Sequence, residues 1–171
     1  RDLSEGLAWT DPGDDWVNYA SAEQEPEAVR SLLAEMRDHS PPWLREFDSW
    51  EELVAHTGAD EVPLNKLGLV TKTRADGTLK RRLVWDLRRS KVNQRMAQGS
   101  RIVLPRVCDL VEDVVVLTRA AGEGEEVEAL VLDISNAFHL LRLNEAEAKY
   151  QTAAAFGKHL LFSAVVFGSR S

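Results

Sequence analysis

The chain of 171 residues has little cysteine and no long apolar run. Its single thiol, Cys108, excludes an internal disulfide framework and a cysteine-based zinc site. A membrane helix requires about 20 consecutive apolar residues, which the sequence does not contain. Its four histidines lack the spacing of metal ligands, and no basic-then-apolar leader opens the chain. These absences favour an intracellular protein, cytoplasmic or nuclear, with no membrane partner, and we expect Cys108 to be buried and inert.

The sequence also lacks the usual signs of a chain end. It starts at Arg1 without an initiator methionine, and it stops at Ser171 soon after an apolar stretch. We therefore expect a piece of a longer polypeptide. Five Trp, five Phe and 44% hydrophobic residues supply enough apolar surface for a globular core.

Positive charge is scarce in the first third of the chain and concentrated in the middle. Residues 1–62 hold 4 Lys and Arg against 16 Asp and Glu, residues 63–110 hold 12 against 3, and residues 111–171 hold 5 against 9. A basic block between acidic flanks is typical of a surface that binds a polyanion. A solvated basic face is the alternative, and the acidic segment 1–62 is able to mask the block by folding against it.

Helical signals dominate the acidic segment. An apolar period begins at Pro26 and ends at Ser40, and a capping box at Ser49 opens a second helix that ends near Gly58. We expect residues 1–62 to form a mostly helical N-terminal segment without chemistry of its own.

The rest of the chain, residues 63–171, alternates strand and helix signals. A hairpin is predicted from strands at 67–73 and 79–86, which flank an Asp-Gly turn. A helix follows Leu104-Pro105-Arg106, and the apolar run 127–132 predicts a central strand. A short helix near Asn144 and strands at 151–156 and 159–166 complete an α+β fold.

Asp133 ends the predicted central strand. A carboxylate at the end of a buried strand is unfavourable unless it is paired, capped or bound to a metal. Asp133 is therefore either a metal ligand or the N-cap of a helix that begins near Ser135.

An ordered series of short motifs gives the sequence a family resemblance. It resembles the reverse transcriptases of retroviruses and of gypsy-like long-terminal-repeat retroelements over about residues 63–171. The matching residues are Lys72, the turn Asp76-Gly77, Arg82, Asp86-Leu87-Arg88, Asn93, Leu104-Pro105-Arg106, the first palm motif Asp133-Ile134-Ser135-Asn136-Ala137-Phe138, and Phe167-Gly168. The resemblance implies the fingers and first part of the palm of a right-hand polymerase, in incomplete form.

The resemblance implies a role for each matching residue in two-metal nucleotidyl transfer. Asp133 is the implied catalytic residue, and its carboxylate and the Ile134 carbonyl bind Mg²⁺. Lys72 and Arg82 clasp the triphosphate of the dNTP. The other implied dNTP contacts are Ser135, Asn136, Ala137, Phe138 and Phe167, and the implied template contacts are Arg88 and Gly168.

Each of these residues also has an ordinary alternative. Lys72, Arg82 and Arg88 are solvated cations in that case, Phe138 is a core residue, and Gly168 only makes a turn. The resemblance instead implies that Phe138 lies beneath the sugar of the incoming nucleotide and excludes a 2′-hydroxyl.

The implied partners are dNTP, an RNA or DNA template-primer, and the remainder of a parent polyprotein with the rest of the palm, the thumb and a ribonuclease H. No aspartate follows Asp133, so the second catalytic carboxylate motif is missing and the chain alone is expected to be inactive. A decayed or truncated retroelement copy that binds nucleic acid without catalysis is the alternative. An unrelated basic hairpin that binds RNA is a third hypothesis, but it leaves residues 133–138 unexplained.

Overall fold

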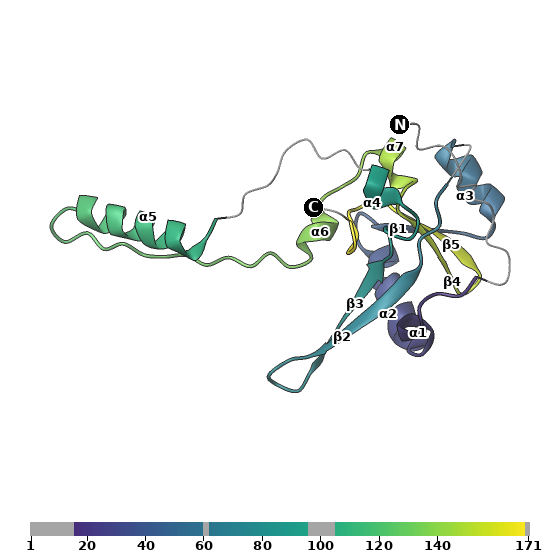
Figure 1. Ribbon diagram of the computed structural model, residues 1–171, viewed down its shortest axis with the longest axis horizontal. Helices are drawn as coiled ribbons and strands as arrows, with labels where there is room; N and C mark the ends of the chain where they lie inside the picture. The colour runs from purple at the N-terminus through teal and green to yellow at the C-terminus, as the bar shows by residue number, and fades with distance from the viewer. Residues whose placement is uncertain (1–15, 60–61, 96–104, 170–171) are drawn as a thin grey trace. The chain divides into compact units, whose positions relative to one another are not determined.

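The computed structural model describes residues 16–59, 62–95 and 105–169. The chain divides into two compact units. The first unit combines residues 1–96 with residues 136–170, and the second contains residues 97–135. The contacts thus group the acidic segment 1–62 with the hairpin and with the C-terminal strands. Figure 1 labels the helices and strands of both units.

Two small antiparallel sheets form the framework of the first unit. One has the order β1-β5-β4, from Leu44–Phe47, Lys158–Phe162 and Thr152–Ala155. The other is the hairpin of β2 (Leu67–Thr73) and β3 (Leu79–Trp85), which projects as a ribbon in Figure 1. Antiparallel sheets combined with separate helices make the fold α+β, as the sequence predicted.

The helices of the first unit are short apart from α2 and α3. They are α1 (Ala20–Glu23), α2 (Pro26–Asp38), α3 (Trp50–Thr57), α4 (Val92–Arg95), α6 (Ala137–Leu140) and α7 (Glu145–Ala148). The α3 boundaries follow the predicted signals, because the Ser49 hydroxyl accepts a hydrogen bond from the Glu52 N–H at 3.1 Å. At the other end Gly58 adopts φ +60°.

The core of the first unit lies between α2, the β1-β5-β4 sheet and the inner half of the hairpin. The α2 side chains that face it recur at helical spacing, as the sequence predicted. Trp85 of β3 meets Phe162 of β5 edge to face, with ring centroids 4.5 Å apart. The other large buried members include Val29, Leu33, Met36, Leu44, Leu67, Leu69, Leu83 and Leu160. The acidic segment therefore supplies one wall of the core.

The second unit differs from two sequence predictions. Its helix α5 (Val107–Ala120) exists as predicted, although Leu104 lies outside the described residues. The strand expected at 127–132 is wrong, since this run is irregular and Leu130, Val131 and Leu132 are 77–89% exposed. A strand requires a neighbour for its backbone hydrogen bonds, and the described residues of this unit contain no strand. Cys108 is exposed, not buried as expected, because α5 buries none of its residues.

Within the described ranges, no helix combines the length and hydropathy that a membrane span requires.

Candidate functional site

One face of the hairpin is basic, and the opposite face contributes apolar side chains to the core. Lys72 pairs directly with Lys80, and Val70 pairs with Arg82. Alternate residues of a strand point to the same face, so Lys72, Lys80 and Arg82 share one face of the ribbon. Leu69 and Leu83 belong to the opposite face and are buried in the core. The core thus fixes the hairpin so that three cations lie together on the side facing away from it.

Arg82 meets an aromatic pair at the base of this basic face. Its guanidinium carbon lies 5.6 Å from the centroid of the Phe167 ring. Phe167 in turn packs against Phe138, with centroids 5.1 Å apart at an interplanar angle of 58°. Phe138 is 41% exposed, so its ring is accessible from solvent. We call Arg82, Phe138 and Phe167 the Arg82 cluster.

A buried histidine supports the Arg82 cluster from behind. His139 follows Phe138 in α6 and is 5% exposed. Its ring lies 5.4 Å from that of Phe167 and 4.9 Å from that of Trp43. Neither ring nitrogen has a hydrogen-bond partner among the described residues. Burial, followed by the positive potential of His39, lowers the pKa of His139 below its ordinary value, which favours the neutral imidazole.

The segment at Phe167 and Gly168 is fixed by its backbone. The Trp85 N–H donates to the Phe167 carbonyl at 2.8 Å, and the Asn93 side-chain amide donates to the Gly168 carbonyl at 2.9 Å. Gly168 has φ +114°, and a Cβ there would lie 2.1 Å from the Trp85 carbonyl oxygen. Two residues from the predicted motif series, Asn93 and Gly168, are thus in direct contact.

Asp86 organises the turn that follows β3. Its carboxylate accepts the backbone N–H groups of Arg88 at 3.1 Å and Arg89 at 3.0 Å, and also the Tyr19 hydroxyl. Burial raises the pKa of Asp86, but these hydrogen bonds outweigh it and the pKa lies below its ordinary value. Asp86 is therefore a turn-forming residue, and Arg88 is an exposed cation at that turn.

The first palm motif crosses the boundary between the two units. Asp133, Ile134 and Ser135 end the second unit, where all three are exposed. Asn136 and Ala137 open α6 in the first unit, and Asn136 is its N-cap with φ +54°. Since the helix begins at Ala137 with Asn136 as its cap, the alternative that Asp133 caps it is wrong.

Asp133 is the one carboxylate of the described residues that the resemblance implies as a metal ligand. Mg²⁺ prefers several carboxylate and water oxygens in octahedral geometry. In the described part of the chain, no group of three or more His, Cys, Asp or Glu residues is placed to hold a metal ion. Asp133 and the Ile134 carbonyl by themselves therefore do not form a two-metal site.

Two members of this region were not predicted from the sequence. Lys80 lies directly opposite Lys72, and counting outward from the Asp76-Gly77 turn would have found this pair. His139 is one of the four histidines that lack the spacing of metal ligands, and the sequence assigns it no place in the site. Its burial between Trp43 and Phe167 depends on long-range packing, which the sequence does not reveal.

Comparisons with protein-family models, with curated proteins and with solved structures found no match to this chain.

Proposed function

We propose that this chain carries the fingers and the first part of the palm of an RNA-directed DNA polymerase of retroelement type. Such an enzyme transfers a nucleotide from a dNTP to the 3′-hydroxyl of a primer on an RNA or DNA template. The described chain would supply the triphosphate clasp and one catalytic carboxylate. The remaining carboxylates and the thumb would come from another part of the parent polyprotein, so the chain alone would be inactive.

The observation that carries this proposal is the Arg82 cluster. Arg82, Phe138 and Phe167 come from three separate motifs, and in the first unit the Phe167 ring lies beside both of the other side chains. A guanidinium beside an aromatic pair, of which Phe138 is exposed and Phe167 half-buried, suits a nucleotide. Arg binds phosphate oxygens bidentately, and aromatic rings pack against a sugar or base. Lys72 on the same face of the hairpin adds a second cation for the triphosphate.

Bound Mg²⁺ would lower the pKa of the primer hydroxyl and neutralise the developing charge on the phosphates. Asp133 and the Ile134 carbonyl are the groups of this chain that would hold it, and hard oxygen ligands of this kind fit the ion. The other named residues would bind and orient the nucleotide, with Phe138 positioned to reject a ribose 2′-hydroxyl.

Primer extension by a parent polypeptide that contains both carboxylate motifs tests the catalytic part of the proposal. Asp133→Asn retains the side-chain shape but removes the charge, so we expect extension to be lost while template-primer binding is retained. Asp113→Asn, at an exposed position of α5, is the matched control and should extend normally. Extension by Asp133→Asn at the wild-type rate would contradict the proposal.

A binding measurement on the present chain separates a nucleotide site from a non-specific basic surface. We expect Arg82→Ala to weaken dNTP binding about tenfold, as the loss of a charge-assisted contact of about 1.4 kcal/mol would do. Arg74→Ala removes the same charge at the far end of the hairpin, outside the Arg82 cluster. Equal losses for the two variants would favour the non-catalytic nucleic-acid-binding alternative.

A further inference from the structure

A second recessed region of the first unit has no role in the proposed function. It is a cleft of about 440 Å³ between the start of α3, the β4–β5 turn and the segment that leads into α1. Three aromatic residues and three carboxylates line it: Trp16, Trp50, Phe156, Glu23, Asp48 and Glu51. We call these six residues the acidic aromatic cleft.

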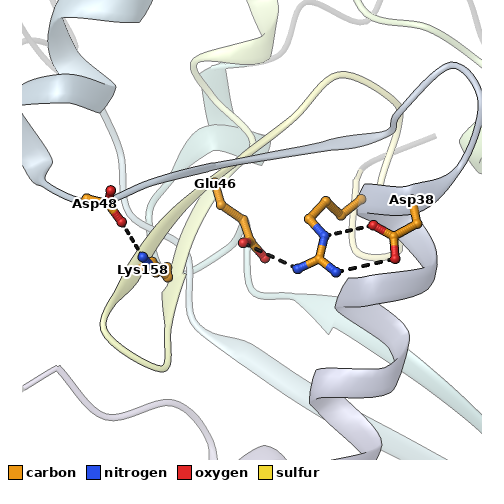
Figure 2. Close-up of polar contacts among 5 residues, drawn as sticks. Asp38, Glu46, Asp48 and Lys158 are labelled. Atoms are coloured by element: carbon orange, nitrogen blue, oxygen red, sulfur yellow. Dashed lines mark hydrogen bonds and ion pairs between the residues drawn. The ribbon is translucent and has the colours of Figure 1, made fainter.

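The charge of this cleft is only partly balanced. Among the described residues, Lys158 is the one lysine or arginine that lines it, and its ammonium forms an ion pair with Asp48 (Figure 2). Glu46, on the neighbouring strand β1, is held by Arg37, which also binds Asp38 (Figure 2). Within the described ranges, neither Glu23 nor Glu51 has an ion-pair partner. Glu23 and Glu51 are therefore the two carboxylates of the cleft that no lysine or arginine of the described ranges neutralises by a direct ion pair.

The aromatic residues of the cleft already attract cations of the chain itself. The Lys66 ammonium lies 5.4 Å from the Trp16 ring centroid, and the Arg30 guanidinium lies 3.8 Å from the Phe156 ring centroid. Such contacts arise because the face of an aromatic ring is electron-rich. Trp50 has only the edge of His159 against it among the described aromatic and cation–π contacts, with ring centroids 5.7 Å apart.

Phe156 stands where its backbone disfavours a large side chain. It is the first residue of the two-residue loop between β4 and β5, with φ +54°, and Gly157 follows with φ +72°. Such loops prefer Asn-Gly, because Asn adopts positive φ far more readily than a bulky residue does. The ring is 39% exposed, and the Arg30 guanidinium lies 3.8 Å from its centroid, so the side chain held in this strained conformation contacts a cation. An unfavourable residue retained at the edge of a cleft points to a role for its ring.

We propose that the acidic aromatic cleft binds an alkylammonium cation. The aromatic faces would stabilise a compact, weakly hydrated cation, and Glu23 and Glu51 would supply the opposite charge. Hydrogen bonds fix the position of Glu23. Its carboxylate accepts the Asn18 backbone N–H at 2.9 Å, and the Asn18 side-chain amide donates to the Ala154 carbonyl at 2.9 Å. The cation is either a free small molecule or an alkylated lysine side chain of a peptide.

Titration of the full chain with three probes tests this proposal. The probes are the amide of N-acetyl-trimethyllysine, its neutral isostere with carbon in place of the quaternary nitrogen, and tetramethylammonium. We expect the trimethyllysine amide to shift the indole N–H resonances of Trp16 and Trp50 saturably, with a Kd of about 1 mM or tighter. The neutral isostere should bind about tenfold more weakly. Tetramethylammonium binding as tightly as the amide would assign the cleft to free small cations, and tighter binding of the amide would assign it to peptides.

Two variants keep the test independent of folding. Phe156→Asn removes the ring but suits the positive φ, so the unfolding temperature should be unchanged or higher while cation affinity falls about tenfold. Glu51→Gln should also weaken binding, whereas Glu27→Gln, at an exposed position of α2 away from the cleft, should not. The proposal is overturned by equal binding of the neutral isostere, by the absence of saturable shifts, or by wild-type affinity in folded Phe156→Asn.

Discussion

At Gly168 a single missing side chain allows two backbone segments to meet. The carbonyl of Trp85 would lie 2.1 Å from a Cβ at this position, and φ is +114°. Both facts disfavour any other residue, since L-residues rarely adopt this φ and a backbone oxygen cannot rotate away. The same approach holds Phe167 beside Arg82. Gly168 therefore has a structural reason to be glycine besides its expected role at the template.

We expect Gly168→Ala to destabilise the chain by roughly 3 kcal/mol through combined strain and collision. The midpoint of urea unfolding measures this change. Gly77→Ala is the matched control, because Gly77 has φ +82° but open space around its Cβ position, and it should lose only about 1 kcal/mol. Equal losses in the two variants would mean that the close approach to Trp85 contributes nothing.

Features of single residues were predicted correctly from the sequence where neighbouring residues alone determine them. The Ser49 cap, the Gly58 end and the Asp76-Gly77 turn each depend on atoms within a few residues, and the structure has all three. The environments of His139 and Cys108 were not predictable in the same way. The environment of His139 depends on rings contributed by distant segments. That of Cys108 depends on whether other residues pack against α5.

At the scale of elements, the β2–β3 hairpin shows how one ribbon serves two purposes. Its inner half contributes Leu69 and Leu83 to the core, while its outer half is exposed throughout. On the core side of that outer half, Arg81 binds Glu25 at the start of α2 with an N···O distance of 2.8 Å. The acidic segment thus neutralises one cation of the hairpin directly, in line with the expected masking of the basic block.

Glu25→Gln should release Arg81 for phosphate binding. We expect the slope of log K against log salt concentration for duplex binding to steepen by about 0.9, which corresponds to one additional phosphate contact. Glu27→Gln makes the same change in net charge on the same helix and should leave the slope unchanged. This substitution is a cleaner test of masking than deletion of residues 1–62, because α2 supplies Val29, Leu33 and Met36 to the core. Identical slopes for the two variants would reduce the effect to net charge.

Elements that close their own hydrogen bonds were easier to predict than those that need a partner. The hairpin and the helices α2, α3 and α5 satisfy their backbones locally, and the sequence predicted each of them. The apolar run at 127–132 has the composition of a central strand but no neighbouring strand in its described unit. The small helices α1 and α4 and the strand β1 lacked a periodic signal long enough to detect.

At the scale of the whole molecule, segments far apart in sequence meet around His139. The rings follow the order His39, Trp43, His139, Phe167 and Phe138, with centroids 3.7–5.4 Å apart. This series joins the end of α2, the approach to β1, α6 and the C-terminal segment in the first unit. Protonation of His139 would place a charge inside it without a hydrogen-bond partner among the described residues.

The stability of the chain should therefore fall in mild acid. The folded-state pKa of His139 lies below the ordinary value of 6.5, because burial and then His39 oppose the charged form. Between these two pKa values the unfolded chain binds the proton and the folded chain does not, so the free energy of unfolding decreases as pH falls below 6.5. Urea midpoints at about pH 7.5 and about pH 5.5 measure the decrease.

His139→Phe preserves a ring between Trp43 and Phe167 but cannot be protonated, and it should show a smaller decrease. His56→Gln, at an exposed histidine, should behave as wild type. If His139→Phe retained the full wild-type decrease, the acid sensitivity would have to come from the other titratable groups.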